Sequence, residues 1–586
     1  MKRFNLGALG ATLALVTTAL ALGSFALPFH AVSATEPAHA DAVLTALKAE
    51  LERSVKGLKL EGIDRPYFVA FAVEENESRR IDASFGALQR RTRDRSRTLR
   101  TDVRLGGYDL DSSDLVQGRN PFLGLFVFPR YLVLDDDVMT LRHEIWLAAD
   151  EAYKEAAERL AQKKGILANR GESDPVPDFT RAQPVVSLGA RKAVLELGDD
   201  WVSRARKLST VFRDFPKVQD SGVTIQASTL HRTLVSSEGT SVVSPSVSVH
   251  LVVHASVQTP DGTVIRKELG FHETDLARLP SEEKLLAEIR AFAGEMTAVS
   301  TAQHLDKYVG PVLLAGEAAP SFFADLLGPN LSGRRAPLSA QPLPAGAFLE
   351  SELVPRIGRP VLPEFLTVVD DPTVERWNGR ALMASYAVDD EGVAAQAVTL
   401  VDKGVLKTLL MGRRPRKEIG PSNGHGRLGT FQGPQPHVAN LFITSSRGRT
   451  EGELKQELIG KVKTQGLPFG LLIRSLAETS GGGSGSSRSR SPLGSPVLAY
   501  KVFPDGREEL VRGLAFGDVT LKSLREIVSS GKEGNLLSGF LSSGGPWTSI
   551  VAPSVLFEEL ELKGESGTRP KPSLLSNPYF DTSRPK

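Results

Sequence analysis

The chain has 586 residues, a length that indicates at least two hydrophobic cores. Its 71 Lys and Arg against 69 Asp and Glu leave a net charge of +2, which argues against a protein that captures nucleic acid electrostatically. Hydrophobic residues at 41% and charged residues at 24% are typical of a globular protein. The sequence contains no cysteine, which excludes disulfides, thiolate metal ligands and cysteine nucleophiles.

The first forty residues have the pattern of an export sequence. Two basic residues precede an uncharged stretch from Phe4 to Phe29, and Ala38-His39-Ala40 follows. This pattern predicts a signal peptide over residues 1–40 with cleavage near Ala40, and therefore a periplasmic or secreted protein with no stable membrane span after cleavage. The alternative is an uncleaved anchor, because the uncharged stretch is long enough to cross a bilayer of roughly 30 Å.

The next region, residues 41–309, is predicted to be an N-terminal domain of mixed helices and strands. Apolar residues at every fourth position predict a helix from Asp41 to Leu60, and the segment from Tyr67 to Glu75 is typical of a buried strand. Asp136-Asp137 predicts the start of a long helix that runs through Leu160. His143-Glu144 in this helix is not a zinc motif of the HExxH type, because the second histidine would have to stand at Leu147.

Four arginines alternate within a second predicted strand and therefore share one of its faces. They are Arg91, Arg93, Arg95 and Arg97. Such a face could bind an anion or a peptide carboxylate, but a solvated face that discourages edge-to-edge pairing is the favoured interpretation.

The remainder of this region alternates strands and one helix. Antiparallel strands are predicted from Val223 to Ile265, with turns at Glu238-Gly239 and Pro260-Asp261-Gly262. Ser281 is predicted to cap a helix. The apolar face of this helix consists of Leu285, Ile289, Phe292 and Met296.

A C-terminal domain, rich in antiparallel strands, is predicted over residues 310–567. Two hairpins are predicted, around Asp402-Lys403-Gly404 and around Pro504-Asp505-Gly506, and a short helix is predicted from Thr520 to Gly531. The Gly/Ser-rich segment from Ser480 to Ser495 predicts a flexible loop, and residues 568–586 form a Pro-rich tail. The predicted fold class is therefore α+β with two domains.

Seven collinear segments resemble the TldD/PmbA family, whose metallopeptidase members form two-domain subunits that pair into dimers. The matching segments are VSSEGT (235–240), LPSEEKLLAEIRAFA, GPVLL, VVDDPT with DDEGVAAQAVTLVDKGVLKTLLMGR, GHGR, PHVANLFI and VFPDGREELVRGLAFGDV. The resemblance implies a two-domain α+β subunit, homodimeric or paired with a TldD-type homologue, that handles unfolded peptides.

The resemblance also implies where a zinc ion would bind. The peptidase members carry HExxxH on a helix after the GPV strand, and a later cysteine completes the ligand set. At the corresponding positions this sequence has Ala324, Asp325 and Pro329, and it has no cysteine. Alanine and proline offer no lone pair to a metal, so we expect no cofactor, no metal and no catalytic residues at these positions.

Two interpretations remain open at this point. The first is a non-catalytic, PmbA/TldE-like subunit that binds peptides or pairs with a catalytic homologue during peptide degradation or maturation. The second is an active metallopeptidase that holds zinc at a non-standard site, for which His425 and His437 are the candidate ligands. The family's historical name, modulator of DNA gyrase, suggests a nucleic-acid enzyme as target, but an export sequence and a near-zero net charge argue against nucleic acid as a partner.

Overall fold

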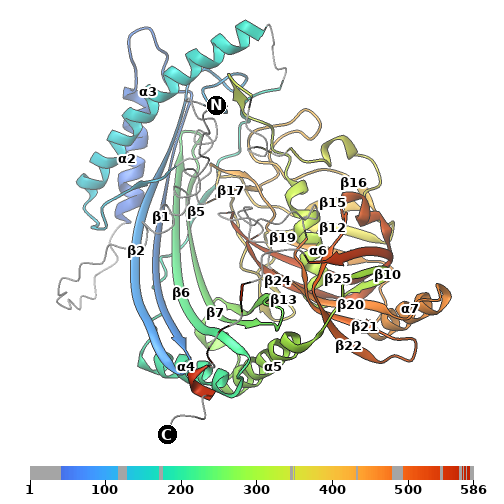
Figure 1. Ribbon diagram of the computed structural model, residues 1–586. Coiled ribbons are helices and arrows are strands. Elements are labelled where there is room, and N and C mark those ends of the chain that lie inside the picture. Colours follow the sequence, from blue (N-terminus) through green and yellow to red (C-terminus); the bar gives the residue numbers. More distant parts are fainter. Residues whose placement is uncertain are drawn as a thin grey trace, which may run out of the picture. The chain divides into compact units, whose positions relative to one another are not determined.

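Figure 1 shows the computed structural model of the chain. It describes residues 41–116, 128–170, 176–342, 348, 350–429, 433–477, 493–540, 545–565, 570–571, 573, 575 and 577–580. The predicted signal peptide over residues 1–40, most of the Ser480–Ser495 loop and most of the Pro-rich tail lie outside the described residues. Within the described ranges, no helix has both the length and the apolar character needed to cross a membrane.

Helices flank the first strands of the chain. The predicted first helix is confirmed as α2 (Ala42–Gly57), which buries Val43 and Leu47. The next helix, α3 (Val138–Arg170), continues ten residues beyond the predicted end at Leu160. The backbone N–H of Thr140 donates to the Asp137 carboxylate at 2.7 Å, so the predicted acidic cap is present.

The N-terminal half is built on a 7-stranded sheet with the order β4-β2-β1-β6-β7-β5, and β8 pairs with β7. Its main strands are long, as Figure 1 shows, and pair in antiparallel register. The strands are β1 (Phe68–Ser84), β2 (Ala87–Arg104), β4 (Arg130–Tyr131), β5 (Val186–Leu188), β6 (Val218–Ser236), β7 (Ser241–Gln258) and β8 (Val264–Glu273).

Two amphipathic helices cover part of one face of this sheet. They are α4 (Asp199–Thr210) and α5 (Glu282–Thr301). The Ser281 hydroxyl accepts a hydrogen bond from the Lys284 N–H at 3.3 Å, as expected of the predicted cap. The apolar face of α5 packs on inward residues of the strands, and this gives the N-terminal half its own core. Its members include Ile81, Ile225, Leu251, Val253, Leu285, Ile289, Phe292 and Met296.

The alternating arginines of β2 do not share one environment. Arg91, Arg93 and Arg95 are exposed, as a solvated face requires. Arg97 is only 1% exposed, and its guanidinium donates to Glu75 at 2.7 Å and to Asp136 at 2.5 Å. Arg97 is therefore an internal ion-pair residue, which its position in a regular alternation did not predict.

The C-terminal half is built on a 12-stranded sheet with the order β16-β15-β12-β19-β25-β10-β20-β21-β22-β9, and β23 and β24 also pair with β25. Most of its pairs are antiparallel, so the predicted α+β class with a β-rich C-terminal part is confirmed. The strands are β9 (Gln303–His304), β10 (Lys307–Leu314), β12 (Leu366–Asp370), β15 (Val398–Asp402), β16 (Val405–Leu406), β19 (Asn440–Ser445), β20 (Gly470–Leu476), β21 (Pro496–Val502), β22 (Glu508–Arg512), β23 (Leu514–Phe516), β24 (Ile527–Phe540) and β25 (Trp547–Gly564).

The remaining elements of this half are short, apart from one helix. That helix is α7 (Glu451–Thr464), capped by Thr450. Strand pairs outside the large sheet involve β3 (Leu115–Val116), β11 (Leu338–Ser339), β13 (Arg376–Trp377), β14 (Arg380–Ala381), β17 (Gly426–Arg427) and β18 (Gln435–Pro436).

Both predicted C-terminal hairpins are confirmed, and the predicted helix after Thr520 is wrong. β15 and β16 pair across the Lys403-Gly404 turn, and β21 pairs with β22. Thr520 does cap a helical turn, but this is a short 3₁₀ helix (Leu521–Glu526), and the chain then continues as β24. Pairing with the distant strand β25 decides the conformation here, since Ile527 and the residues after it complete that ladder.

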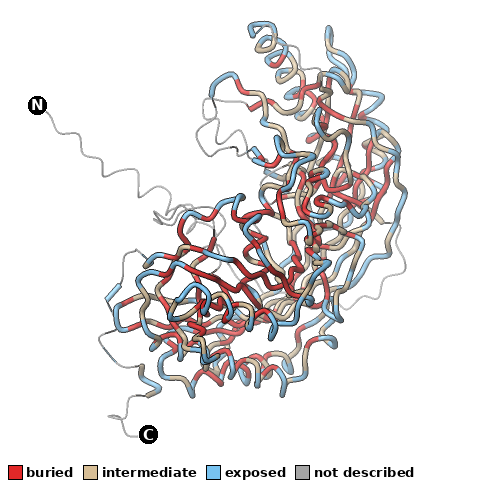
Figure 2. The backbone as a smooth tube through the Cα atoms, turned by 90° about the vertical axis from the view of Figure 1, so that its right-hand side faces the viewer, coloured by how far each residue is buried: buried red, intermediate tan, exposed pale blue. Residues whose placement is uncertain are grey.

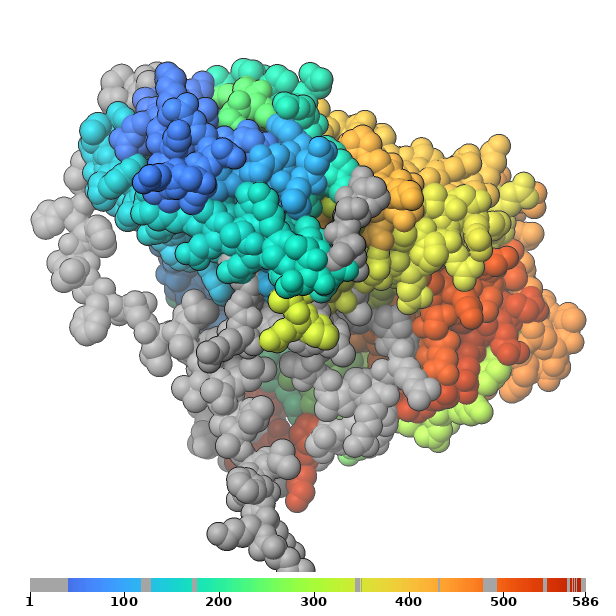
Figure 3. All heavy atoms as spheres, turned by 90° about the horizontal axis from the view of Figure 1, so that it is seen from above, coloured from blue at the N-terminus to red at the C-terminus, as the bar shows by residue number. Residues whose placement is uncertain are grey.

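Side-chain contacts join the two halves at several points. Arg512 pairs with Asp261 at 3.1 Å, and the Arg170 guanidinium donates to the carbonyl of Ser339 at 2.7 Å. On the face in Figure 3, segments before residue 200 (blue to cyan) lie beside segments around residues 340–450 (yellow to orange). Buried residues run through both halves, as Figure 2 shows.

Candidate functional site

The helix that corresponds to the family's metal-binding helix is α6 (Ala318–Leu326), which follows β10 directly. Ala324 is 3% exposed and lies within the apolar core of the C-terminal half. Asp325 is half-buried, and Pro329 is exposed in the 3₁₀ turn that follows α6 (Gly328–Leu331). Of these three residues, only Asp325 has a side-chain atom that could bind a metal.

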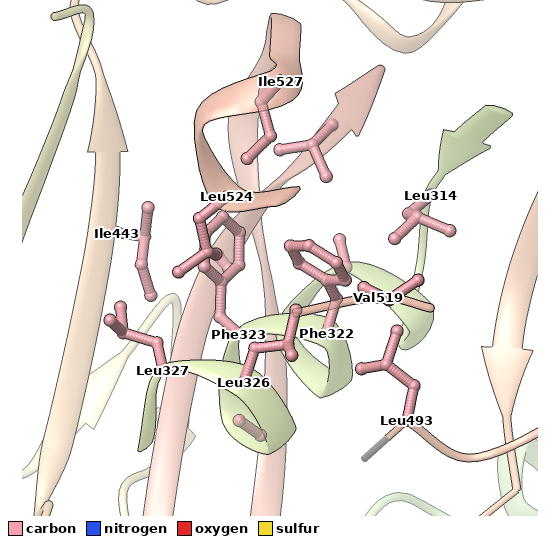
Figure 4. Packing of buried hydrophobic residues seen from close by; sticks show 14 of the residues in the cluster. Leu314, Phe322, Phe323, Leu326, Leu327, Ile443, Leu493, Val519, Leu524 and Ile527 are labelled. Carbon is pink, nitrogen blue, oxygen red and sulfur yellow. The ribbon is translucent and has the colours of Figure 1, made fainter. Parts of the chain in front are cut away.

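Aromatic and aliphatic side chains surround α6 on its buried faces. Phe322 is fully buried, and its ring centroid lies 5.5 Å from that of Phe323 and 5.2 Å from that of Phe557. Figure 4 shows these phenylalanines packed among Leu314, Leu326, Leu327, Ile443, Leu493, Val519, Leu524 and Ile527. A tetrahedral zinc site needs at least three nitrogen, sulfur or oxygen donors, and α6 offers one carboxylate in an apolar setting. The residues present therefore do not fit a zinc ion.

The two candidate ligands of the alternative site lie beside each other on the β17–β18 hairpin. The N–H of His437 donates to the carbonyl of His425 at 3.1 Å. His425 is completely buried, with Nε2 3.1 Å from an Asp370 carboxylate oxygen and Nδ1 2.9 Å from the carbonyl oxygen of Asn423. Both ring nitrogens of His425 lie at hydrogen-bond distance from protein oxygens, so neither is free to bind a metal ion.

His437 is different because its Nε2 is buried and has no hydrogen-bond partner among the described residues. Burial, together with the charges of Arg427 and Arg334, lowers the pKa of His437 to about 4. The ring is therefore neutral near pH 7. A single free imidazole does not make a zinc site, and the described part of the chain contains no group of three or more His, Cys, Asp or Glu placed to hold a metal ion.

A buried polar junction lies close to the same hairpin, and acidic residues of the DDEG segment form its centre. The Asp389 carboxylate accepts from the N–H groups of Val393 at 2.8 Å and Gly426 at 2.9 Å. The Glu391 carboxylate accepts from the Arg413 N–H at 2.6 Å. Burial raises the pKa of Glu391 to about 7, and burial and the nearby Glu391 charge raise the pKa of Asp389.

Arg413 connects this junction to the N-terminal half. Its guanidinium donates to the carbonyl of Thr180 at 2.6 Å and to the Glu238 carboxylate at 2.8 Å. The Arg413 guanidinium also lies 3.9 Å from the ring centre of Phe179, and the guanidinium of Arg104 lies 3.6 Å from the same ring centre. Glu238 belongs to the VSSEGT turn, so three of the resembling segments meet at one buried site.

No sequence pattern linked Glu391 to Arg413. The sequence feature that points to the Glu391 carboxylate is the pair of glycines beside it, Gly412 and Gly426. A Cβ on Gly412 would lie 2.4 Å from Glu391 Oε2, and a Cβ on Gly426 would lie 2.2 Å from the same atom. Glycine is therefore required at both positions to admit the carboxylate. The junction binds two halves of the molecule and has no arrangement of nucleophile, base and open metal position.

Comparison with known proteins identifies the C-terminal half. Residues 307–564 match the family described as PmbA/TldA metallopeptidase C-terminal domain. Residues 307–564 belong to the TldD/PmbA family. The family match covers α6, the large sheet apart from β9, and the C-terminal residues of the polar junction, but not the N-terminal sheet.

The relatives of this TldD/PmbA protein are distant in sequence. A Buchnera aphidicola metalloprotease TldD homolog is 29% identical over 101 residues, which are 17% of this chain and 20% of that protein. A Methanothermobacter thermautotrophicus metalloprotease is 24% identical over 204 residues, 33% of this chain and 39% of that protein. The chain thus spans about a fifth to two-fifths of the length of the curated relatives it matches.

Solved structures resemble the whole fold. A Thermotoga maritima protein matches 88% of this chain and 99% of its own, with a TM-score of 0.56 and 16% identity. TldE from Thermococcus kodakarensis matches 89% of this chain and 100% of its own, with a TM-score of 0.54 and 14% identity. At such low identity the similarity concerns the fold alone. Because the two matches cover 88% and 89% of this chain, the shared fold includes both the N-terminal and the C-terminal sheet.

Proposed function

We propose that this TldD/PmbA protein is an exported, non-catalytic subunit that binds peptides or pairs with a catalytic homologue in peptide degradation or maturation. The observation that carries the proposal is α6, where Ala324 and Pro329 replace metal-ligating side chains and the surroundings are apolar. The printed names of the relatives, metalloprotease and TldE, support this class of activity and a two-subunit assembly. The pairing partner is a second copy or a TldD-type homologue.

Peptide binding is supported by open strand edges in the N-terminal sheet. Among the described strands, β4 pairs with β2 only at Thr98 and Leu99, and none covers the edge from Ala87 to Arg97. An extended peptide can add to such an edge through backbone hydrogen bonds, and the side chains of the edge then select its sequence. The exposed arginines of β2 would favour acidic peptides.

The test uses the mature chain, residues 41–586, purified alone and mixed with a TldD-type metalloprotease. We expect no cleavage of an unfolded, fluorophore-labelled peptide by the chain alone, and no change in thermal stability on adding a chelator. A stable complex with the homologue, measured by native mass, is expected if the partner role holds. Chelator-sensitive cleavage by the chain alone, with zinc that is lost in His425→Ala, would instead establish the alternative metallopeptidase.

The export part of the proposal has its own test. N-terminal sequencing of protein recovered from the producing cells should give Asp41 as the first residue, because cleavage is expected after Ala40. Recovery of the chain with residues 1–40 in the membrane fraction would show an uncleaved anchor and contradict the predicted location.

A further inference from the structure

Three half-buried side chains of the C-terminal half each have a buried nitrogen atom with no hydrogen-bond partner among the described residues. They are Arg334, Arg427 and His437, which we call the cationic cluster. The Nε atom of Arg334, the Nε and Nη1 atoms of Arg427 and the Nε2 atom of His437 have no hydrogen-bond partner among the described residues. A buried donor left unsatisfied costs about 1–3 kcal/mol, and more when it is charged. Several such donors in one region therefore call for an acceptor.

The members of the cationic cluster lie close enough to act on one another. The positive charges of Arg427 and Arg334 both contribute to lowering the pKa of His437. Arg427 and His437 stand on the paired segments β17–β18, in the GHGR and PHVANLFI sequences. Arg334 follows the 3₁₀ turn after α6, so the cluster borders the segment where the family motif has been lost.

Arg334 has no carboxylate of its own. No described residue forms an ion pair or a hydrogen bond with its guanidinium, which lies 4.8 Å from the ring centre of Phe348. Asp114 acts on Arg334 from a distance, but it pairs with Arg414 at 2.7 Å. Burial lowers the pKa of Arg334 to about 10, so the side chain is still charged near pH 7.

Arg427 shares its only nearby carboxylate. Asp390 lies 3.6 Å from the Nε of Arg427, while the same residue pairs more closely with Arg232 from β6. Asp390 also accepts the N–H of Leu428 at 2.7 Å. The Arg427 guanidinium otherwise stacks 4.3 Å from the ring centre of Tyr386. The region therefore has more guanidinium donors than carboxylate acceptors.

We propose that Arg334, Arg427 and His437 form a binding site for an oxyanion, a carboxylate or a phosphate. Guanidinium groups present pairs of N–H donors that match the oxygens of carboxylate and phosphate, and neutral His437 supplies a further donor through Nε2. The oxyanion has two sources, the carboxylate of a bound peptide or a free small anion. The peptide source rests on the proposed function, whereas the free-anion source does not.

The test measures binding to the mature chain without a partner or a cleavage assay, so its outcome is independent of the proposed catalytic role. The probes are inorganic phosphate, an unfolded pentapeptide with a free C-terminal carboxylate and the same pentapeptide amidated at its C-terminus. We expect a saturable rise in Tm with phosphate or with the free carboxylate, because a ligand that binds only the folded state stabilises it, and no rise with the amidated peptide. A response to the peptide alone identifies the peptide source, and a response to phosphate alone identifies a free anion.

The variants separate binding from structural support. Arg334→Leu should weaken the binding of the anion at least tenfold. It should also raise the Tm of the ligand-free protein, because it removes an unpaired buried charge. Arg206→Leu, at an exposed arginine of α4, should change neither quantity. If Arg334→Leu does not fold, Arg427→Gln and His437→Gln provide the same comparison.

Two results would overturn the proposal. One is the absence of a saturable response to any of the probes in the unaltered chain, which would mean that ordered water alone satisfies these donors. The other is a response that persists unchanged in Arg334→Leu and Arg427→Gln, which would place the anion elsewhere.

Discussion

Helix α6 and the polar junction around Glu391 are both buried in the C-terminal half, but they bury different kinds of side chain. At α6, phenylalanine and leucine side chains pack against the large sheet, and Ala324 is part of that packing. At the junction, carboxylates and a guanidinium are buried, and each carries a specific partner. The difference shows that specific polar contacts are buried at the junction between the halves, whereas α6 is an ordinary element of the apolar core.

The largest effect should come from deleting a core ring at α6. Phe322→Ala removes a fully buried side chain between Phe323 and Phe557, and should lower the free energy of unfolding by about 4 kcal/mol through lost burial and a residual cavity. Urea denaturation measures it. Tyr131→Ala, at a position 74% exposed, is the control and should change stability by less than about 1 kcal/mol. A small change in the free energy of unfolding of Phe322→Ala would mean that α6 is not part of the hydrophobic core.

Removing the guanidinium of the polar junction should cost somewhat less. Arg413→Leu leaves the Thr180 carbonyl without its guanidinium donor and removes the ion pair of Glu238, whose carboxylate keeps the hydrogen bond from the Tyr108 hydroxyl. This change should destabilise the protein by about 3 kcal/mol. The comparison variant is Arg90→Leu, whose side chain is 65% exposed, with an expected change below about 1 kcal/mol. Equal stability of the two variants would show that the junction does not hold the halves together.

The pH dependence of stability should distinguish the two regions next. The pKa of Glu391 is raised by burial to about 7, so the folded state holds a proton that the unfolded state releases near its ordinary pKa of 4.5. The contribution of the protonated form is fully present below about pH 4.5 and is lost as the pH rises to about 7. Glu391→Gln should therefore gain stability relative to the unaltered chain over this range, on the order of 2 kcal/mol by pH 8.

The matched control for this measurement is Glu61→Gln, at an exposed glutamate, which should follow the unaltered chain at every pH. Urea midpoints between pH 4 and pH 8 supply the data. A Glu391→Gln curve parallel to that of the unaltered chain would mean that Glu391 ionises in the folded state as freely as in the unfolded one.

The smallest effects should come from restoring the family's histidines. Ala324→His places a large polar ring in a packed apolar site and should cost about 1–2 kcal/mol. Pro329→His, at an exposed position, should change stability by less than about 0.5 kcal/mol. Neither variant should retain zinc after dialysis, measured by elemental analysis, because the remaining donors are absent from α6. Retained zinc in the double variant would show that the surroundings still accept a metal.

Local patterns predicted many elements correctly and failed where distant strands decide. The helix after Ser281 and the hairpin turn at Lys403-Gly404 depend on neighbours in the chain, and both were found. The segment after Thr520 has a good helix cap, but ten residues between Ile527 and Phe540 pair with β25 instead of forming a helix. The absence of metal-ligating side chains at Ala324 and Pro329 could also be recognised from the sequence, because it depends only on the residue types at these positions.

The polar junction could not be predicted from the sequence. Arg413 bonds to Thr180, which is 233 positions away in the chain, and to Glu238, which is 175 positions away. The same holds for His425, a candidate zinc ligand in the sequence, which is fully buried against Asp370, 55 positions earlier. No local periodicity carries the information that such residues meet.

The sequence by itself determined the α+β class, the absence of a thiolate ligand and the absence of metal-ligating side chains at Ala324 and Pro329, because residue chemistry and short-range periodicity decide these properties. Only the tertiary structure decided that Ala324 belongs to an apolar core, that both ring nitrogens of His425 face protein oxygens and that the Arg334 guanidinium has no acceptor among the described residues. Burial and hydrogen-bond partners depend on which distant segments fold against one another, and a hydrogen bond or an ion pair acts only over a few ångströms of space, whatever the separation along the chain.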